Sequence, residues 1–143
     1  MAIVKSPALV LRRHDLRETS LLVNFFTREY GKIIGEMKGV RADPKKFASP
    51  IDTFSLNDII YYQKKSGYHL VSQCDLAEHY PGCRQSAEKI TAATAMMELV
   101  DAVMPPEDVN REIFDLSART LSALCTQSDI GRLLMIFKIK VVS

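Results

Sequence analysis

The segment from Gly31 to Phe54 reads GKIIGEMKGVRADPKKFASPIDTF. Its first part, Lys32 to Lys38, mixes apolar and polar residues after a glycine, which predicts a short β-strand. Its second part, Gly39 to Pro50, holds Gly, Asp, Pro and Ser, which indicates a loop. A long loop between short strands is typical of a small closed barrel, so this segment decides the predicted fold.

The same loop and its entry carry four cations and one aromatic residue. A flexible basic segment of this kind can bind a phosphate backbone, and an aromatic side chain beside it can stack on a base. Short basic loops are common, however, and an ordinary solvated loop is the alternative interpretation. The candidate contacts in this segment are Lys38, Arg41, Lys45, Lys46 and Phe47.

Four other segments of residues 1–79 also have the composition of strands. Lys64-Lys65-Ser66-Gly67 is a hairpin turn signal, and in the segment after it His69, Val71 and Gln73 are predicted to share one face. Five short strands with one long loop predict a five-stranded barrel of the OB type, a fold that commonly binds single strands or sugars. The predicted strands are Ser6–Arg13, Ser20–Thr27, Lys32–Lys38, Thr53–Gln63 and Tyr68–Cys74.

Residues 80–143 are predicted to form a helical domain, which makes the chain an α+β protein with domains 1–79 and 80–143. Pro81-Gly82 marks the boundary, and Pro105-Pro106 ends the first helix. Asn110 and Ser128 are predicted to cap the second and third helices. Apolar residues at spacings of three and four are predicted to face the core of the first two helices: Ile90, Ala93, Met97, Val100 and Met104 in one, and Phe114, Ala118, Leu121 and Cys125 in the other.

The third predicted helix, residues 130–142, is apolar around most of its circumference. Nine of its residues are Ile, Leu, Met, Phe or Val. A helix of this kind needs neighbours on several sides. We therefore expect the helical domain to be incomplete, either because the chain is the front of a longer protein or because this end is buried in an oligomer.

Charge is distributed unevenly along the 143 residues. Residues 1–65 carry twelve Lys or Arg and seven Asp or Glu, whereas residues 66–143 carry seven and ten. This asymmetry indicates a basic module joined to a more acidic one. The chain has no signal-peptide pattern and no apolar stretch long enough for a membrane span, so a cytoplasmic protein without membrane contact is expected.

Catalytic and metal-binding motifs are missing from the sequence. The histidines His14, His69 and His79 form no ligand pair, and phosphate-binding and nucleophile motifs are absent. The three cysteines have unrelated spacings, which is typical of small buried side chains in a reduced protein. We expect neither an enzyme nor a cofactor nor a metal site.

Three segments together resemble the RecO family of bacterial recombination mediators. Glu18-Thr19-Ser20-Leu21-Leu22 resembles a Glu-x-Ser-x-Leu run, and Phe26-Thr27 with Gly31-Lys32 resembles a Phe-Thr-x-x-x-Gly-Lys run. Lys38-Gly39-Val40-Arg41, with Lys45 and Lys46 after it, resembles the family's Lys-Gly-Ala-Arg stretch and the basic residues that follow. The first predicted helix, with Met97-Glu98-Leu99-Val100-Asp101, is also similar to the family's, so the resemblance covers essentially the whole chain.

The resemblance implies an OB-fold barrel and a helical domain that bind single- and double-stranded DNA, anneal complementary strands and help to load recombinase in DNA repair. The implied partners are RecR and the tail of single-stranded DNA-binding protein. The basic loop would hold phosphates, Arg12, Arg13 and Arg17 are second choices for the same role, and Phe47 and Tyr62 are candidates for stacking. For both aromatic residues the alternative is core packing.

The sequence departs from the family pattern in two respects. Family members are usually longer and often carry a four-cysteine zinc module near the end, which this sequence lacks. Asp43 also places a negative charge inside the basic loop. A protein-interaction module and an OB-fold RNA binder therefore remain alternative functions.

Overall fold

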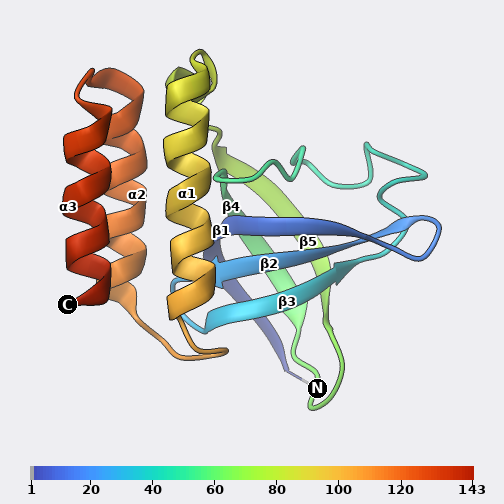
Figure 1. Ribbon diagram of the computed structural model, residues 1–143. Helices are drawn as coiled ribbons and strands as arrows, with labels where there is room; N and C mark the ends of the chain where they lie inside the picture. Colours follow the sequence, from blue (N-terminus) through green and yellow to red (C-terminus); the bar gives the residue numbers. More distant parts are fainter. Residues whose placement is uncertain (1) are drawn as a thin grey trace.

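Five strands close into a barrel, and three helices pack against one side of it (Figure 1). The structure is a computed structural model that describes residues 2–143. The strand order is β1-β2-β3-β5-β4, with β3 and β5 parallel and all other neighbours antiparallel. The OB-like barrel is confirmed. Its strands are β1 (Ile3–Leu16), β2 (Ser20–Thr27), β3 (Gly31–Met37), β4 (Leu56–Tyr62) and β5 (His69–Glu78).

The barrel encloses a core of its own because each strand turns alternate side chains inward. On β2, Leu21, Val23 and Phe25 are buried in this core. Val10 from β1 and Tyr61 from β4 are buried in the same core. All five predicted strands exist. Their observed ends differ by up to four residues from the predicted ones, because barrel closure extends the pairing of β1 and β5.

The alternation predicted for β5 fails at one point. Tyr61 pairs with Val71 and Ile60 with Gln73, so Ser72 is an extra residue opposite β4. This β-bulge reverses the alternation beyond it. Cys74 therefore joins Val71 in the barrel core, and Gln73, predicted on the face of Val71, is exposed.

The helical half consists of the short 3₁₀-helix η1 (Pro81–Arg84), α1 (Ala87–Val103), α2 (Arg111–Thr126) and α3 (Ile130–Val142). η1 was not predicted from the sequence. Asn110 caps α2 as predicted, with its Oδ1 accepting from Ile113 N at 3.0 Å. The cap of α3 is Asp129 and not Ser128, since the Asp129 carboxylate accepts from Arg132 N at 3.2 Å. Within residues 2–143, no helix has the length and apolar character needed to cross a membrane.

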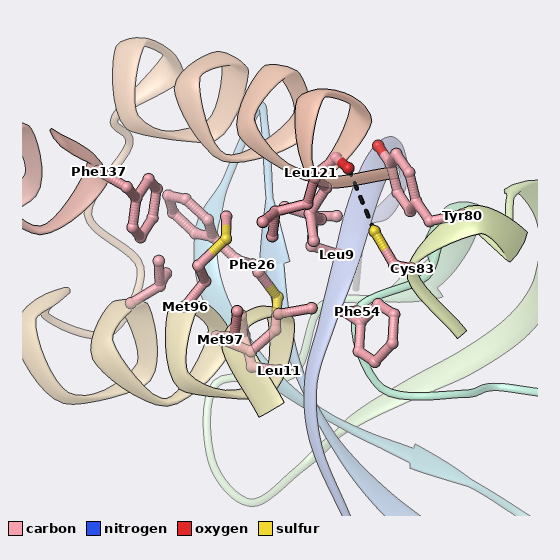
Figure 2. Close-up of a cluster of buried hydrophobic side chains, with 14 of the residues drawn as sticks. Leu9, Leu11, Phe26, Phe54, Tyr80, Cys83, Met96, Met97, Leu121 and Phe137 are labelled. Carbon is pink, nitrogen blue, oxygen red and sulfur yellow. Dashed lines mark hydrogen bonds between the residues drawn. The ribbon is translucent and has the colours of Figure 1, made fainter. Parts of the chain in front are cut away.

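A second core joins the helices to the outer face of the barrel. Figure 2 shows Leu9 and Phe26 from the barrel packed among Met96, Leu121 and Phe137 of the helices. Four of the five residues predicted to face the core from the first helix are buried, and Ile90 is exposed. The buried stripe is wider than predicted, because this helix lies between the barrel and two helices. The buried residues of this helix are Ala92, Ala93, Met96, Met97 and Val100.

The apolar third helix is only partly covered. Its neighbours α1 and α2 bury Phe137 and Val141, whereas Met135, Ile139 and Val142 are 57%, 58% and 66% exposed. Part of the apolar circumference of α3 is therefore exposed within residues 2–143.

Four charged side chains bridge the barrel and α2. Arg28 donates two hydrogen bonds to Asp115, at 3.0 and 3.1 Å, and Arg111 Nε donates to Glu29 at 3.1 Å. The hydrogen bond from Arg28 lowers the pKa of Asp115 below its ordinary value of 3.8, and that from Arg111 lowers the pKa of Glu29 below 4.5. Both ion pairs are partly exposed to solvent, so salt weakens their contribution to the stability of the fold.

This bridge predicts an acid-sensitive junction. A carboxylate with a lowered folded-state pKa stabilises the fold above its unfolded-state pKa and loses this effect as the pH falls through the folded value. The stability difference between wild type and Asp115→Asn should therefore be constant from pH 7 to about 5 and shrink below about pH 4. Urea unfolding at low salt measures this difference. Asp58→Asn, at an exposed acid with no cationic partner within residues 2–143, is the control. A difference for Asp115→Asn that is independent of pH would contradict the prediction.

Candidate nucleic-acid interface

The loop of residues 38–55 starts beside the β1–β2 hairpin, at the end of the barrel away from the helices, and runs back toward α1, where β4 begins (Figure 1). Three apolar side chains hold this loop on the barrel: Val40, Phe47 and Ile51 are all buried in the barrel core. Ser49 adds a polar anchor, since its Oγ donates to Asn57 Oδ1 at 2.5 Å and accepts from Ile51 N at 3.0 Å. The loop is therefore a packed part of the fold.

Arg41 joins the loop to the hairpin. Its guanidinium donates to the carbonyls of Arg17 and Glu18, and Nη1 lies 3.2 Å from Asp15 Oδ2. Its backbone N–H donates to Thr19 O at 2.9 Å. With its side chain only 28% exposed, Arg41 is a structural link whose charge Asp15 partly offsets.

Arg13 and Lys46 also hold the loop, but through neutral partners. Arg13 Nη1 donates to the carbonyls of Pro50 and Ile51 at 3.3 and 2.9 Å. Lys46 Nζ donates to Lys38 O at 2.6 Å. A carbonyl partner satisfies the donor without cancelling its charge, so both residues still contribute to a positive field at this end of the barrel.

Among the cations of this loop, Lys38 and Lys45 point freely into solvent. Both are exposed, and within residues 2–143 neither ammonium group has a hydrogen-bonding or ionic partner. They belong to the same loop, in which Lys46, next to Lys45 in the chain, donates through Nζ to the backbone of Lys38. These two lysines are the best placed of the predicted residues to bind an external phosphate.

Arg12 and Arg17 are partly neutralised by carboxylates. Arg17 forms an ion pair with Glu36 at 3.1 Å. Arg12 lies 4.0 Å from Asp101, and the same carboxylate forms an ion pair with Lys32 at 3.4 Å. Arg12 faces a groove of about 530 Å³ between β1 and α1. The other charged or titratable residues that line this groove are Arg13, His14, Glu98 and Asp101. This mixed charge is less suited to a phosphate backbone than the loop is.

The two aromatic predictions have different outcomes. Phe47 is only 8% exposed and packs in the barrel core, which corrects its assignment as a stacking residue, because a buried ring offers no face to a base. Tyr62 is half-buried on the outer face of β4, opposite Ile3 and Leu70. It lies at the end of β4 away from the loop, about 20 Å along the strand, so the structure does not bring it together with the basic loop.

A second surface with two lysines, not predicted from the sequence, lies at the β4–β5 turn. A groove of about 760 Å³ is lined by Lys64, Lys65 and His69, together with Glu107 from the segment before α2. His69 accepts from Lys64 N through Nδ1 at 3.0 Å, and its Nε2 lies 3.0 Å from Glu107 Oε1. The signal in the sequence was the pair Lys64-Lys65, which also belongs to the predicted turn.

Comparison with known families accounts for this architecture. The family model described as "Recombination protein O N terminal" matches residues 1–80, and the model "Recombination protein O C terminal" matches residues 84–143. The chain belongs to the RecO family. Within the fold, the first RecO model matches the barrel. The second begins at the last residue of η1 and matches all three helices.

Curated RecO relatives support the same assignment. A DNA repair protein RecO from Salinibacter ruber is 32% identical over 124 residues, which are 86% of this chain and 48% of the relative. A second, from Syntrophus aciditrophicus, is 27% identical over 95% of this chain and 53% of its own length. The chain thus spans about half the length of the curated relatives it matches.

Proposed function

We propose that this chain is the DNA-binding part of a recombination mediator, which holds single- and double-stranded DNA at the basic end of its barrel and works without turnover. The observation that carries the proposal is the pair of unpartnered lysines, Lys38 and Lys45, on a loop packed against the barrel. The names of its curated relatives, DNA repair protein RecO, support the same process.

The basic loop is suited to sequence-independent binding. Lys38 and Lys45 contact phosphates directly, while Arg13 and Lys46 add to the positive field and Arg41 keeps the loop on the hairpin. Phosphate contacts of this kind release counterions, so binding weakens steeply with salt and depends little on base sequence. Because the loop is anchored by buried side chains, little ordering is needed when DNA binds.

Annealing and recombinase loading extend this proposal and rest on the family resemblance. A protein that holds one strand by its phosphates leaves the base edges free to pair with a complementary strand. RecR and the tail of single-stranded DNA-binding protein are the proposed protein partners, and recombinase loading is the proposed outcome. Faster pairing of complementary oligonucleotides in the presence of the chain would support the annealing step.

The test compares two double variants with the same change in net charge. Lys38→Glu with Lys45→Glu alters the proposed site, and Lys138→Glu with Lys140→Glu alters exposed lysines on α3. Fluorescence anisotropy with labelled single- and double-stranded oligonucleotides at several salt concentrations is the measurement. The first variant should bind at least about tenfold more weakly and lose about two units of log–log salt slope, whereas the second should bind like wild type.

Equal losses in the two double variants would mean that only net charge matters, and they would refute a localised site. Arg41 and Lys46 are left intact because they hold the loop, and their reversal would change its structure as well as its charge. Preference for RNA of the same length would instead favour an RNA binder, through contacts to the 2′-hydroxyl.

The exposed apolar face of α3 favours a second candidate function, the binding of a protein. Met135, Ile136, Ile139 and Val142 are 37–66% exposed on this helix. An exposed apolar patch is typical of protein contact surfaces. Binding to the tail of single-stranded DNA-binding protein that persists in the Lys38→Glu, Lys45→Glu variant, without any DNA binding by wild type, would favour this candidate.

A further inference from the structure

Two cysteines that are 42 positions apart meet in the helical half. Cys83 Sγ in η1 lies 2.9 Å from Cys125 Sγ near the end of α2. Cys83 Sγ also donates to Leu121 O at 3.3 Å, the contact drawn as a dashed line in Figure 2. The sulfur–sulfur distance is only about 0.9 Å longer than a disulfide bond.

The backbone at this contact brings the two cysteines together. A Cβ atom added to Gly82 would lie 2.7 Å from Cys125 O and 2.9 Å from Cys125 Cβ. Only glycine allows η1 to approach the end of α2 this closely. The two segments are therefore already placed for a covalent link, and a small movement of the side chains is enough to close it.

We propose that Cys83 and Cys125 are a modification site, a dithiol that a peroxide oxidises to an intramolecular disulfide. The half-buried Cys125 thiolate attacks one peroxide oxygen, so that an S–O bond forms and the O–O bond breaks. The leaving hydroxide takes up the proton that the Cys125 thiol released and becomes water. Cys83 Sγ then attacks Cys125 Sγ, the S–S bond forms, and the sulfenic oxygen leaves with the proton of the Cys83 thiol as a second water. Two thiols lose two electrons, and one peroxide is reduced to two waters.

The environments of the sulfurs support this order. Cys83 is fully buried, and burial raises the pKa of its thiol to about 12, so it is a poor first nucleophile. Its Sγ lies 2.9 Å from Cys125 Sγ, and this contact suits it to the second step. The third cysteine, Cys74, is buried in the barrel core, and burial also raises the pKa of its thiol to about 12. Cys74 belongs to the other hydrophobic core and serves as an internal control.

The disulfide would tie the connection between barrel and helices to the end of α2. η1 directly follows β5 and precedes α1, and the closed loop would span α1 and most of α2. A cross-link across 42 positions restricts the unfolded chain, and the folded state gains stability as a result. Oxidation should raise the Tm by about 5 °C or more.

The test treats the native chain with hydrogen peroxide, quenches it, and labels the remaining thiols with a maleimide after denaturation. Wild type should accept three labels before oxidation and one after it, with the remaining label on Cys74. Its unlabelled mass should fall by two hydrogen atoms, and its Tm should rise. Cys74→Ser should still form the disulfide, whereas Cys125→Ser, at a half-buried position, should keep its other two thiols and its Tm after oxidation.

Three outcomes would overturn the proposal. These are three labelled thiols after oxidation, a cross-link between two molecules, and an oxygen added to Cys125 without a link to Cys83. Peptide mapping separates them. If Cys125→Ser is too unstable to purify, Cys125→Ala and the mapped disulfide of Cys74→Ser decide the question by the same readouts.

Discussion

Replacing Phe26 by alanine is expected to lower the free energy of unfolding by about 3–5 kcal/mol. The Phe26 ring is fully buried between the barrel and the helices, and its centroid lies 5.8 Å from that of Phe114 on α2. Its removal leaves a cavity between two rigid layers that cannot collapse easily, so both the transfer free energy and the packing are lost. Urea unfolding followed by circular dichroism measures the effect.

Two controls separate packing at this junction from the general cost of losing an aromatic ring. Tyr68→Ala removes a ring that is 40% exposed and should change stability by about 0.5 kcal/mol or less. Phe26→Leu keeps most of the volume and should cost about 1.5 kcal/mol or less. A Phe26→Ala loss as small as that of Tyr68→Ala would show that the junction contributes little to folding.

Gly31→Ala is expected to cost about 3 kcal/mol, from backbone strain together with a steric clash. Gly31 begins β3 with φ of +75°, and a Cβ there would lie 2.6 Å from Asp108 N and 2.7 Å from Asp108 O. The segment before α2 lies on this glycine, since Glu107 N donates to Lys32 O at 2.8 Å. An alanine would therefore push this connection off the barrel.

Gly67→Ala is the matched control for Gly31→Ala. Gly67 has φ of +76° and no atom within 4 Å of its added Cβ, so this variant should show the backbone strain alone, about 1–2 kcal/mol. The additional loss in Gly31→Ala measures the contact with Asp108, and faster hydrogen exchange at the Glu107 amide should accompany it. Equal losses at the two glycines would refute this account.

The kinds and order of the elements were largely predictable from local patterns. Strand-forming composition and turn residues predicted five strands, and apolar spacings of three and four predicted the first two helices. The third helix was predicted from an apolar stretch after a capping residue. The failures are local exceptions with structural causes: the bulge at Ser72, the short η1, and the cap at Asp129. A bulge depends on how two strands align, and this alignment has no signal within either strand.

The candidate site was predictable as a set of cations but not as an arrangement. Lys38, Arg41, Lys45 and Lys46 do lie on one loop between β3 and β4, as predicted. Their different roles follow from residues far away in the sequence, since Asp15 and the hairpin carbonyls hold Arg41. Phe47 likewise packs into the barrel core, where burial of its ring helps to hold the loop on the barrel.

By itself, the sequence determined the fold class and the basic character of the loop, because periodicity and charge are properties of neighbouring residues. The tertiary structure alone decided that Lys38 and Lys45 are free while Arg13, Arg41 and Lys46 hold the loop, and that Cys83 meets Cys125. These facts depend on contacts between segments 8 to 42 positions apart, and only barrel closure and helix packing bring such segments together.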